Sequence, residues 1–331
     1  MTGWAGARPG RRAVLAGAAA LVAAGAGRAA AQGGRITRVV VPVPAGGGMD
    51  ACARLFAEFA PRETLGQAIV ENRPGGALRL AIEFVQRSEP DGRTLLFAPA
   101  SVFTIYPHIY RRLTYELERD FAPISTFCEF ELALGVPAAS PASTLAEYLA
   151  WVRREGGRAA AFAVPAAGSA AHFAGARLAR LARVPLEHVP YRGSAPAMQD
   201  LLAGAVPAAF NVAGEFAAHR AAGRVKVLAT TGARRSPFYP DVPTFAESGF
   251  PDLVAGEWFG LFAPAATPAA TVAALNAAVA SALARPEVLS RLETLAYVPL
   301  HMDSAAFAAR IRAEREGWAE TIRATGFVVE E

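Results

Sequence analysis

Short apolar runs alternate along the chain with longer stretches in which apolar residues recur every three to four positions. The short runs predict buried strands, and the longer stretches predict amphipathic helices. Because strands separated by helices favour parallel sheets covered by helices, the pattern indicates an α/β fold of two similar modules with a cleft between them. The strands are expected near 38–43, 68–70, 94–97, 160–164, 186–189, 208–212 and 225–230.

Local signals place the starts of several helices. Thr144 and Glu147 have the spacing of a capping box and predict a helix that continues to about 154. The other helices are expected at 50–60, at 75–86, from near 170, 195 and 214, and over 271–324 with breaks at Pro286 and Pro299.

The first 31 residues have the composition of an export signal. Arg11 and Arg12 precede an uncharged run over 13–27, and the small residues at 29–31 form a cleavage site. The uncharged run is shorter than the ~20 residues that span a bilayer. We therefore expect 1–31 to be a signal peptide that is cleaved near Ala31, so that the mature protein leaves the cytoplasm. The paired arginines suit the twin-arginine route, and an ordinary Sec signal is the alternative.

Composition excludes some partners. With 53% hydrophobic and 19% charged residues the chain is globular, and its 331 residues suffice for two domains. The net charge of +4 comes from the arginines of 1–31, since the rest of the chain has equal numbers of acidic and basic side chains. Lys226 is the only lysine. Nucleic acid is not expected as a partner, because no basic excess remains to neutralise phosphates.

The two cysteines leave two alternatives open. An exported protein can join Cys52 and Cys128 in a disulfide. Alternatively, Cys52 is a small buried residue, because it shares the apolar face of its predicted helix with Leu55 and Phe56. Without a C-x-x-C spacing the pair alone forms no zinc or redox site.

Three glycine-rich turns follow predicted strands and are the first candidates for a binding site. In the first turn, Gly46-Gly47-Gly48 precedes Asp50. Glycines let a backbone approach a ligand, and a helix N-terminus offers N–H donors to an anion, although Asp50 can cap those donors itself. The turn has neither the G-x-G-x-x-G fingerprint nor a following Gly-Lys-Ser/Thr, so no nucleotide site is indicated. The other two turns lie at 73–77 and 167–172.

Ser169 and His172 raise the alternative of a hydrolase. They lie only one helical turn apart, and the chain has no G-x-S-x-G elbow, so a catalytic triad is not favoured. The five histidines show no H-E-x-x-H pattern, and no metal is expected. Trp258 and Phe259 lie on an apolar run and are expected in the core, with pocket lining as the alternative.

Short motifs follow one another in order over nearly all of the mature chain. They are Val40–Pro44 with Gly46–Gly48 and Asp50, followed by 71–75, 90–96, 120–123, 172–175, 189–193, 235–237, 241–244 and 258–261. In this set and order the chain resembles the Bug family, the periplasmic solute-binding proteins of tripartite tricarboxylate transporters.

The resemblance implies two doubly wound α/β domains of the type II periplasmic-binding kind, with the ligand cleft between them. Crossover strands near 125–136 and 257–263 would join domain 1, residues 32–128 and 258–331, to domain 2, residues 129–257. The resemblance also implies that a small organic carboxylate binds in the cleft, with no cofactor. Domain 2 would close over it with the loops 165–169 and 191–193.

The site residues that the resemblance implies lie on loops after the strands. They are Ala45, Gly46, Gly47, Gly48, Met49, Asp50, Gly75, Gly76, Arg79, Ser101, Ala167, Gly168, Ser169, Tyr191 and Asn211.

Four departures from the family pattern change the expected ligand. Met49 replaces a threonine, Arg79 an asparagine and Asn211 an aspartate, while 164–168 lacks the usual polar side chains. We therefore expect a drier far wall with one positive charge at Arg79, and no tricarboxylate ligand. The alternative for Arg79 is a solvated arginine on a helix surface.

These observations predict an exported, non-enzymatic protein of the periplasm. It would bind a small carboxylate as a monomer and deliver it to the membrane permease subunits of a tripartite tricarboxylate transporter. The alternatives are an exported α/β hydrolase that uses Ser169, and a periplasmic sensor domain on the same scaffold.

Overall fold

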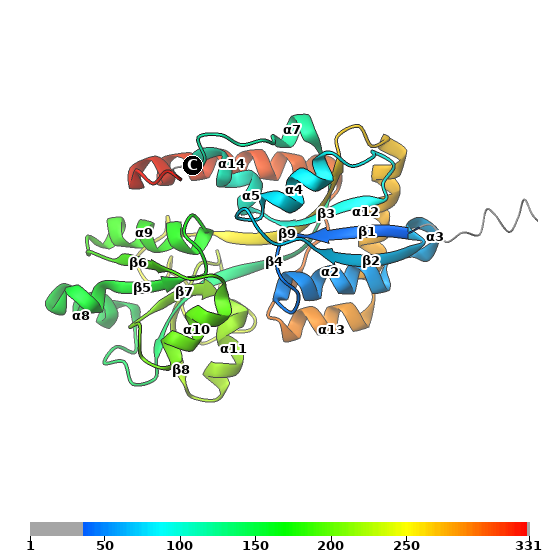
Figure 1. Ribbon diagram of the computed structural model, residues 1–331. Coiled ribbons are helices and arrows are strands. Elements are labelled where there is room, and N and C mark those ends of the chain that lie inside the picture. Colours follow the sequence, from blue (N-terminus) through cyan, green and yellow to red (C-terminus); the bar gives the residue numbers. More distant parts are fainter. Residues whose placement is uncertain (1–35, 330–331) are drawn as a thin grey trace, which may run out of the picture.

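The computed structural model describes residues 36–329, which form a mixed α/β protein of two lobes (Figure 1). The predicted signal peptide and its cleavage site near Ala31 lie outside the described residues. The first lobe begins with β1 (Ile36–Val41), α2 (Gly48–Phe59), α3 (Arg62–Leu65), β2 (Gln67–Asn72), α4 (Arg79–Gln86), β3 (Thr94–Pro99), α5 (Ser101–Thr104), α6 (Tyr106–Ile109) and α7 (Leu117–Asp120).

The chain then crosses to the second lobe and returns. The second lobe is built from β4 (Phe121–Pro137), α8 (Leu145–Glu155), the 3₁₀ turn η1 (Gly157–Ala160), β5 (Ala161–Val164), α9 (Ala170–Ala182), β6 (Glu187–Pro190), α10 (Ser194–Leu202), β7 (Ala209–Val212), α11 (Ala213–Ala221) and β8 (Val225–Thr230). The return to the first lobe consists of β9 (Gly256–Pro264), α12 (Ala269–Leu283), α13 (Pro286–Thr294), β10 (Val298–Pro299) and α14 (Ser304–Thr325).

One path of hydrogen-bonded strands runs through both lobes in the order β2-β1-β3-β9-β4-β7-β5-β6. β1 is parallel to β2 and β3, and β5 is parallel to β6 and β7, as the alternation of strands and helices predicts. β7 and β8 both pair antiparallel with β4, so they run in the same direction with β4 inserted between them. The predicted mixed α/β architecture is confirmed.

Successive residues of the central strands enter different cores. Val40 and Leu96 pack in the core that includes residues of α4, α5 and α14. Val39 and Phe97 pack in the core formed with α2, α12 and α13. Because successive side chains of a strand point to opposite faces, burial of both faces explains why these strands are continuous apolar runs.

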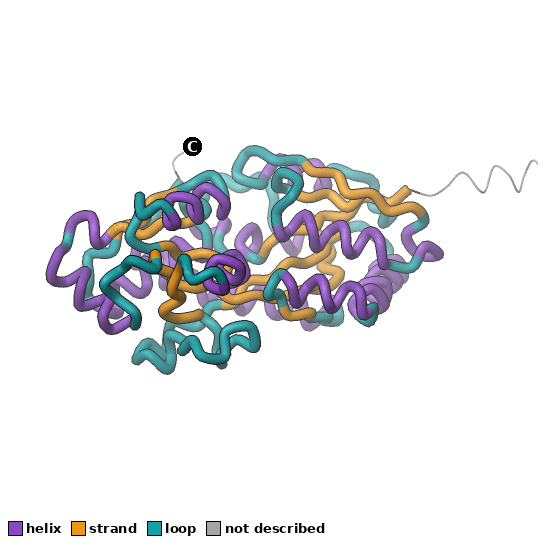
Figure 2. Tube along the Cα trace, turned by 90° about the horizontal axis from the view of Figure 1, so that it is seen from below, coloured by secondary structure: helices purple, strands orange, loops and turns teal. Residues whose placement is uncertain are grey.

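The two predicted crossover strands are present and lie side by side. β4 and β9 pair antiparallel from Phe121 opposite Pro264 to Glu131 opposite Gly256, and Figure 2 shows strands continuing from one lobe into the other. On β9, Trp258 is fully buried and its Nε1 donates a hydrogen bond to Glu314 at 2.8 Å. The prediction that Trp258 belongs to the core is confirmed.

The described part of the chain has no single helix that is long and apolar enough to cross a membrane. Within these described residues, α12 and α13 together have the length and apolar composition of a membrane span, but the chain bends by 74° at the break between them.

Candidate functional site

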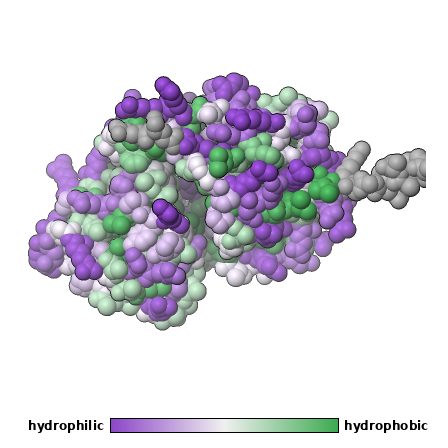
Figure 3. Space-filling view, viewed as in Figure 1, coloured by the Kyte–Doolittle hydropathy of each residue, from purple (hydrophilic) through white to green (hydrophobic). Residues whose placement is uncertain are grey.

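The predicted site residues lie at the ends of the parallel strands of both lobes. The loops after β1, β2 and β3 share one edge of the first lobe, because the carboxyl ends of parallel strands meet at the same edge. The space-filling view shows a hollow between the lobes (Figure 3). Contacts between the lobes include Gly168, where an added Cβ would lie 2.7 Å from Ile109 and 3.5 Å from Phe327.

The loop after β1 leads into a helix whose N-terminus has no side-chain cap. The N-cap of α2 is Gly47, and no side chain accepts a hydrogen bond from the first turn. Ala45, Gly46 and Gly47 are exposed. The amides at the start of this helix therefore remain available to an anion.

Two of the three glycines of this loop occupy positions that a residue with a side chain would not fit, each for a different reason. Gly46 has φ +99°, a conformation that L residues rarely adopt. At Gly48 a Cβ would lie 2.2 Å from the hydroxyl of Tyr297, so only glycine lets the helix start approach this buried side chain. Gly47 has open space around its Cα, and nothing within 4 Å of an added Cβ. Met49 is buried in the core rather than presented to the cleft.

Asp50 is buried and fixes the loop from behind. Its carboxylate accepts hydrogen bonds from the Gly46 amide at 2.9 Å, from Asn72 Nδ2 at 2.9 Å, and from Arg54 Nε at 2.9 Å and Nη2 at 3.0 Å. Asp50 lies inside the first turn of α2 and its side chain reaches back to Gly46, so the alternative role of an N-cap falls to Gly47 instead. Asp50 is therefore a positioning residue.

The charge of Asp50 is stabilised by the same contacts. Burial acts to raise the pKa of its carboxyl, but the hydrogen bonds from Arg54, Gly46 and Asn72 outweigh burial and hold the pKa below its usual value. Asn72 also donates to the Val43 carbonyl at 3.0 Å, so the loops after β1 and β2 are joined through one side chain.

The loop after β2 keeps a left-handed backbone over four consecutive residues. Gly75, Gly76, Ala77 and Leu78 have φ values of +128°, +55°, +48° and +73°. Helix α4 consequently begins at Arg79, and the expectation that Gly75 and Gly76 open this helix is wrong. Left-handed geometry costs a residue with a Cβ about 1–2 kcal/mol. The surrounding fold maintains this loop shape despite that cost.

Arg79 is half-buried beside Tyr110 of the first lobe. Its Nε donates to the Gly76 carbonyl at 2.9 Å, and its guanidinium lies 4.6 Å from the centre of the Tyr110 ring. Arg79 is thus partly exposed at the start of α4 and packs on Tyr110, and whether its charge serves the cleft stays a prediction. Tyr110 forms a bridge with Val329 near the end of the described chain.

The second lobe supplies the remaining predicted residues from three loops. Ala167 is exposed, whereas Gly168 is buried with φ +75°. Ser169 is the N-cap of α9 and its hydroxyl accepts from the His172 amide at 3.2 Å while donating to the Ala166 carbonyl at 2.7 Å. The His172 imidazole accepts through Nδ1 from the Gly168 amide at 3.1 Å. Both side chains therefore stabilise the loop, and their geometry does not favour a hydrolase.

Tyr191 and Asn211 are held by neighbours in the second lobe. Tyr191 donates to Asp200 at 2.6 Å; burial and this contact raise the pKa of Tyr191 to about 12. Asn211 is fully buried, and its Oδ1 accepts from Ser194 and from the Val212 amide, which fixes the orientation of the amide. Its Nδ2 has no partner. Asn211 therefore offers an unused donor.

Ser101 and one residue not singled out from the sequence lie near the end of β3. Ser101 is buried at the start of α5. Glu257 of β9 is also buried, and burial together with repulsion from Glu314 raises the pKa of its carboxyl to about 8, although a hydrogen bond from the Ala100 amide lowers it. The sequence signal that could have singled out Glu257 is an acidic residue directly beside the apolar run 258–264.

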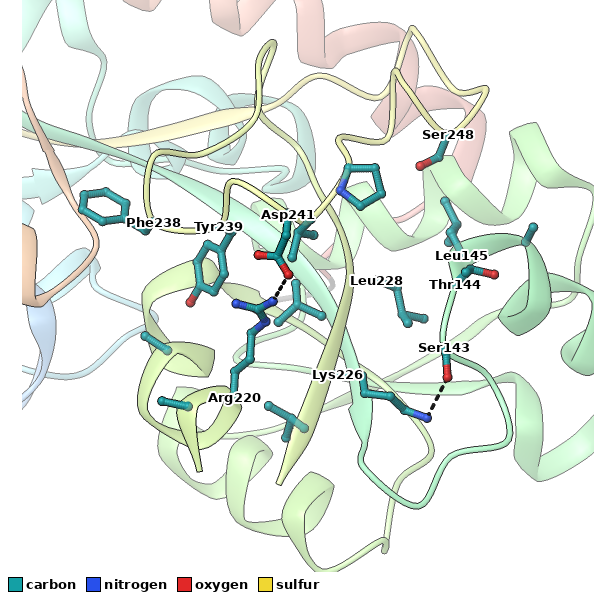
Figure 4. A pocket seen from close by; sticks show the side chains of 17 residues that line it. Ser143, Thr144, Leu145, Arg220, Lys226, Leu228, Phe238, Tyr239, Asp241 and Ser248 are labelled. Atoms are coloured by element: carbon teal, nitrogen blue, oxygen red, sulfur yellow. Dashed lines mark hydrogen bonds and ion pairs between the residues drawn. The ribbon is translucent and has the colours of Figure 1, made fainter. Parts of the chain in front are cut away.

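A separate cavity of about 940 Å³ lies in the second lobe, away from every predicted site residue (Figure 4). Its charged side chains are already matched. Arg220 is paired with Asp241, and Lys226 donates to the Ser140 carbonyl at 2.7 Å. Within residues 36–329 no group of three or more potential ligand side chains could hold a metal ion.

Comparisons with known proteins agree with this architecture. A sequence model described as "Tripartite tricarboxylate transporter family receptor" matches residues 52–327. The chain is 34% identical, over 317 residues, to the UPF0065 protein of the tcbD-tcbE intergenic region of Pseudomonas sp. (strain P51), covering 95% of this chain and 94% of that protein.

Two solved structures are similar over most of their length. MatC from Rhodopseudomonas palustris, solved with bound malate, has a TM-score of 0.78 and 32% identity, covering 87% of this chain and 99% of MatC. R. palustris Rpa4515, solved with adipate, has a TM-score of 0.82 and 27% identity, covering 90% and 99%. The predicted resemblance is confirmed, and the chain belongs to the family of extracytoplasmic solute-binding receptors of tripartite tricarboxylate transporters.

Proposed function

We propose that this protein binds a small dicarboxylate in the hollow between its lobes and delivers it to the permease of a tripartite transporter. The observation that carries the proposal is the uncapped N-terminus of α2, which is preceded by the exposed residues Ala45, Gly46 and Gly47. One carboxylate of the ligand accepts hydrogen bonds from the backbone amides at the start of α2, while the Gly46 amide stays bonded to Asp50. Asp50 keeps the loop in position without contacting the ligand.

The other predicted residues would receive the rest of the ligand. The left-handed loop at 75–78 presents further amides, with Arg79 beside it. Across the hollow, Ala167, Gly168, Ser169, Tyr191 and Asn211 form the facing wall in this proposal. Malate in MatC and adipate in Rpa4515 support a dicarboxylate of four to six carbons.

Closure of the lobes accompanies binding in this proposal. In this proposal the described residues 36–128 and 258–329 belong to one domain and 129–257 to the other, with β4 and β9 connecting them. Two connecting strands permit a hinge motion that narrows the hollow between the lobes, which already touch where Gly168 packs against Ile109. We expect a monomer that is exported through the Sec or the twin-arginine route and cleaved near Ala31.

The test uses two substitutions at one position. Gly47 has φ −86°, which suits alanine and lies within a few degrees of the range that proline requires, and an added Cβ meets no atom within 4 Å. Gly47→Ala keeps the N–H group, whereas Gly47→Pro removes it. We expect calorimetry to show that Gly47→Ala binds malate or adipate within about threefold of wild type, while Gly47→Pro binds about tenfold or more weakly. Equal affinity of all three proteins would contradict the proposed role of these amides.

A further inference from the structure

A second cavity is lined by basic side chains and shares no lining residue with the predicted carboxylate site, although elements of both lobes form it. It has a volume of about 590 Å³ and lies between α9, β6 and the end of α14, where Figure 1 shows α14 passing above α9. His172, Arg177, Arg180 and His188 contribute its basic groups, and no aspartate or glutamate is among the described residues that line it. We call it the His–Arg cavity.

The two arginines of this cavity are not neutralised by acids of the described chain. Neither Arg177 nor Arg180 takes part in an ion pair within residues 36–329, unlike Arg220 in the other large cavity. The Nε of Arg177 is shielded from solvent and has no hydrogen-bond partner. Because solvent does not reach this Nε, an anion in the cavity would be bound through the outer nitrogens of the Arg177 and Arg180 guanidinium groups.

The histidines form a stacked pair at one end of the cavity. The ring centres of His172 and His188 are 3.7 Å apart, and the Phe327 ring meets His172 edge-on at 4.9 Å. Burial and the proximity of His188 lower the pKa of His172 to about 4, so the stack is neutral in the absence of an anion. Burial disfavours protonation of both imidazoles, so the histidines bound the cavity as neutral rings and the arginines supply its charge.

The donor set fits an oxyanion with several oxygens. Two guanidinium groups present planar sets of N–H donors, and Thr321 adds a hydroxyl to the same cavity, whereas the Thr325 hydroxyl already donates to the Ile322 carbonyl at 2.7 Å. We propose that the His–Arg cavity binds a phosphate-type oxyanion, independently of the carboxylate in the hollow between the lobes. Bound phosphate would contact Arg177 and Arg180 directly and lie beside the histidine stack.

Occupancy of this cavity is connected to the loop of the second lobe through one side chain. His172 lines the cavity and its Nδ1 also accepts the hydrogen bond from the Gly168 amide. A change in the environment of His172 therefore reaches Gly168, which contacts Ile109 in the first lobe. Gly168 does not line the His–Arg cavity, but the chemical shift of its amide should respond when the cavity binds an anion.

Calorimetry with inorganic phosphate on the mature protein tests the proposal. We expect saturable binding to wild type and at least about tenfold weaker binding to Arg177→Gln and to Arg180→Gln. Arg180 is exposed, so its replacement does not disturb folding even where that of Arg177 does. Arg312→Gln on α14 removes the same charge from an exposed position outside the cavity and should bind phosphate as wild type does.

Nuclear magnetic resonance assigns the position of the anion. Phosphate should shift the ring signals of His188 and the amide of Gly168, and Gly47→Pro should leave these shifts unchanged because it alters the other site. The proposal is overturned if wild type shows no saturable phosphate binding, if Arg312→Gln loses as much affinity as the cavity variants, or if phosphate shifts Gly46–Gly48 and leaves His188 unchanged.

Discussion

Replacing Asp50 by asparagine should loosen the binding loop and destabilise the protein. The carboxylate receives hydrogen bonds from the Gly46 amide, from Asn72 and from Arg54, all at 2.9–3.0 Å. Arg54 is 51% exposed, so its ion pair contributes only about 0–1 kcal/mol. The two contacts within the loops are hydrogen bonds to a buried charge, and we expect Asp50→Asn to lower the free energy of unfolding by about 3 kcal/mol in total.

Urea denaturation at several pH values measures this loss. Because the fold lowers the pKa of Asp50, its contribution is fully present above the unfolded value of 3.8 and is lost as the pH falls through the folded value. The difference between wild type and Asp50→Asn should therefore be largest at pH 7 and shrink towards pH 3. Asp252→Asn, at an exposed carboxylate, is the control. Equal stabilities at pH 7, or a difference that does not change with pH, would refute the reasoning.

The remaining predictions concern the charge beside the second loop, a buried acid and the thiols. Arg79→Ala should weaken dicarboxylate binding by about ten- to a hundredfold in calorimetry, and Arg79→Asn less; binding within twofold of wild type would exclude this role. The pKa of Glu257, raised to about 8, makes the free energy of unfolding fall as the pH rises from about 5 to 8, and Glu257→Gln should abolish that fall in thermal denaturation. Cys52 and Cys128 are free and fully buried, so mass spectrometry should find both unalkylated in the native protein and both alkylated after unfolding without reductant, whereas a disulfide would leave them unmodified.

The strands were predictable because their signals are local, whereas the crossovers were expected only from the family resemblance. Val39, Val40 and Val41 form a continuous apolar run since both faces of β1 are buried. Thr144 and Glu147 form the capping box that their spacing predicts. The uncapped start of α2 also follows from its glycines. These features depend on residues that are close together in the sequence.

The features of the candidate site that the sequence could not predict depend on contacts between segments that are far apart in the chain. Asp50 reaches Asn72, and Gly48 is required by Tyr297, which lies far along the chain. Leu78 adopts a left-handed backbone although its residue type disfavours it, because the fold determines the shape of that loop. The stack of His172 on His188 likewise joins the start of α9 to β6.

Titration of the ¹⁵N-labelled mature protein with malate and with adipate tests the central claim most directly. The account predicts that at least one of these dicarboxylates produces saturable shifts that are largest at the amides of Gly46, Gly47, Gly48 and Met49, at the start of α2. Binding that leaves these four amides unchanged would contradict the account, as would the absence of saturable binding by either dicarboxylate.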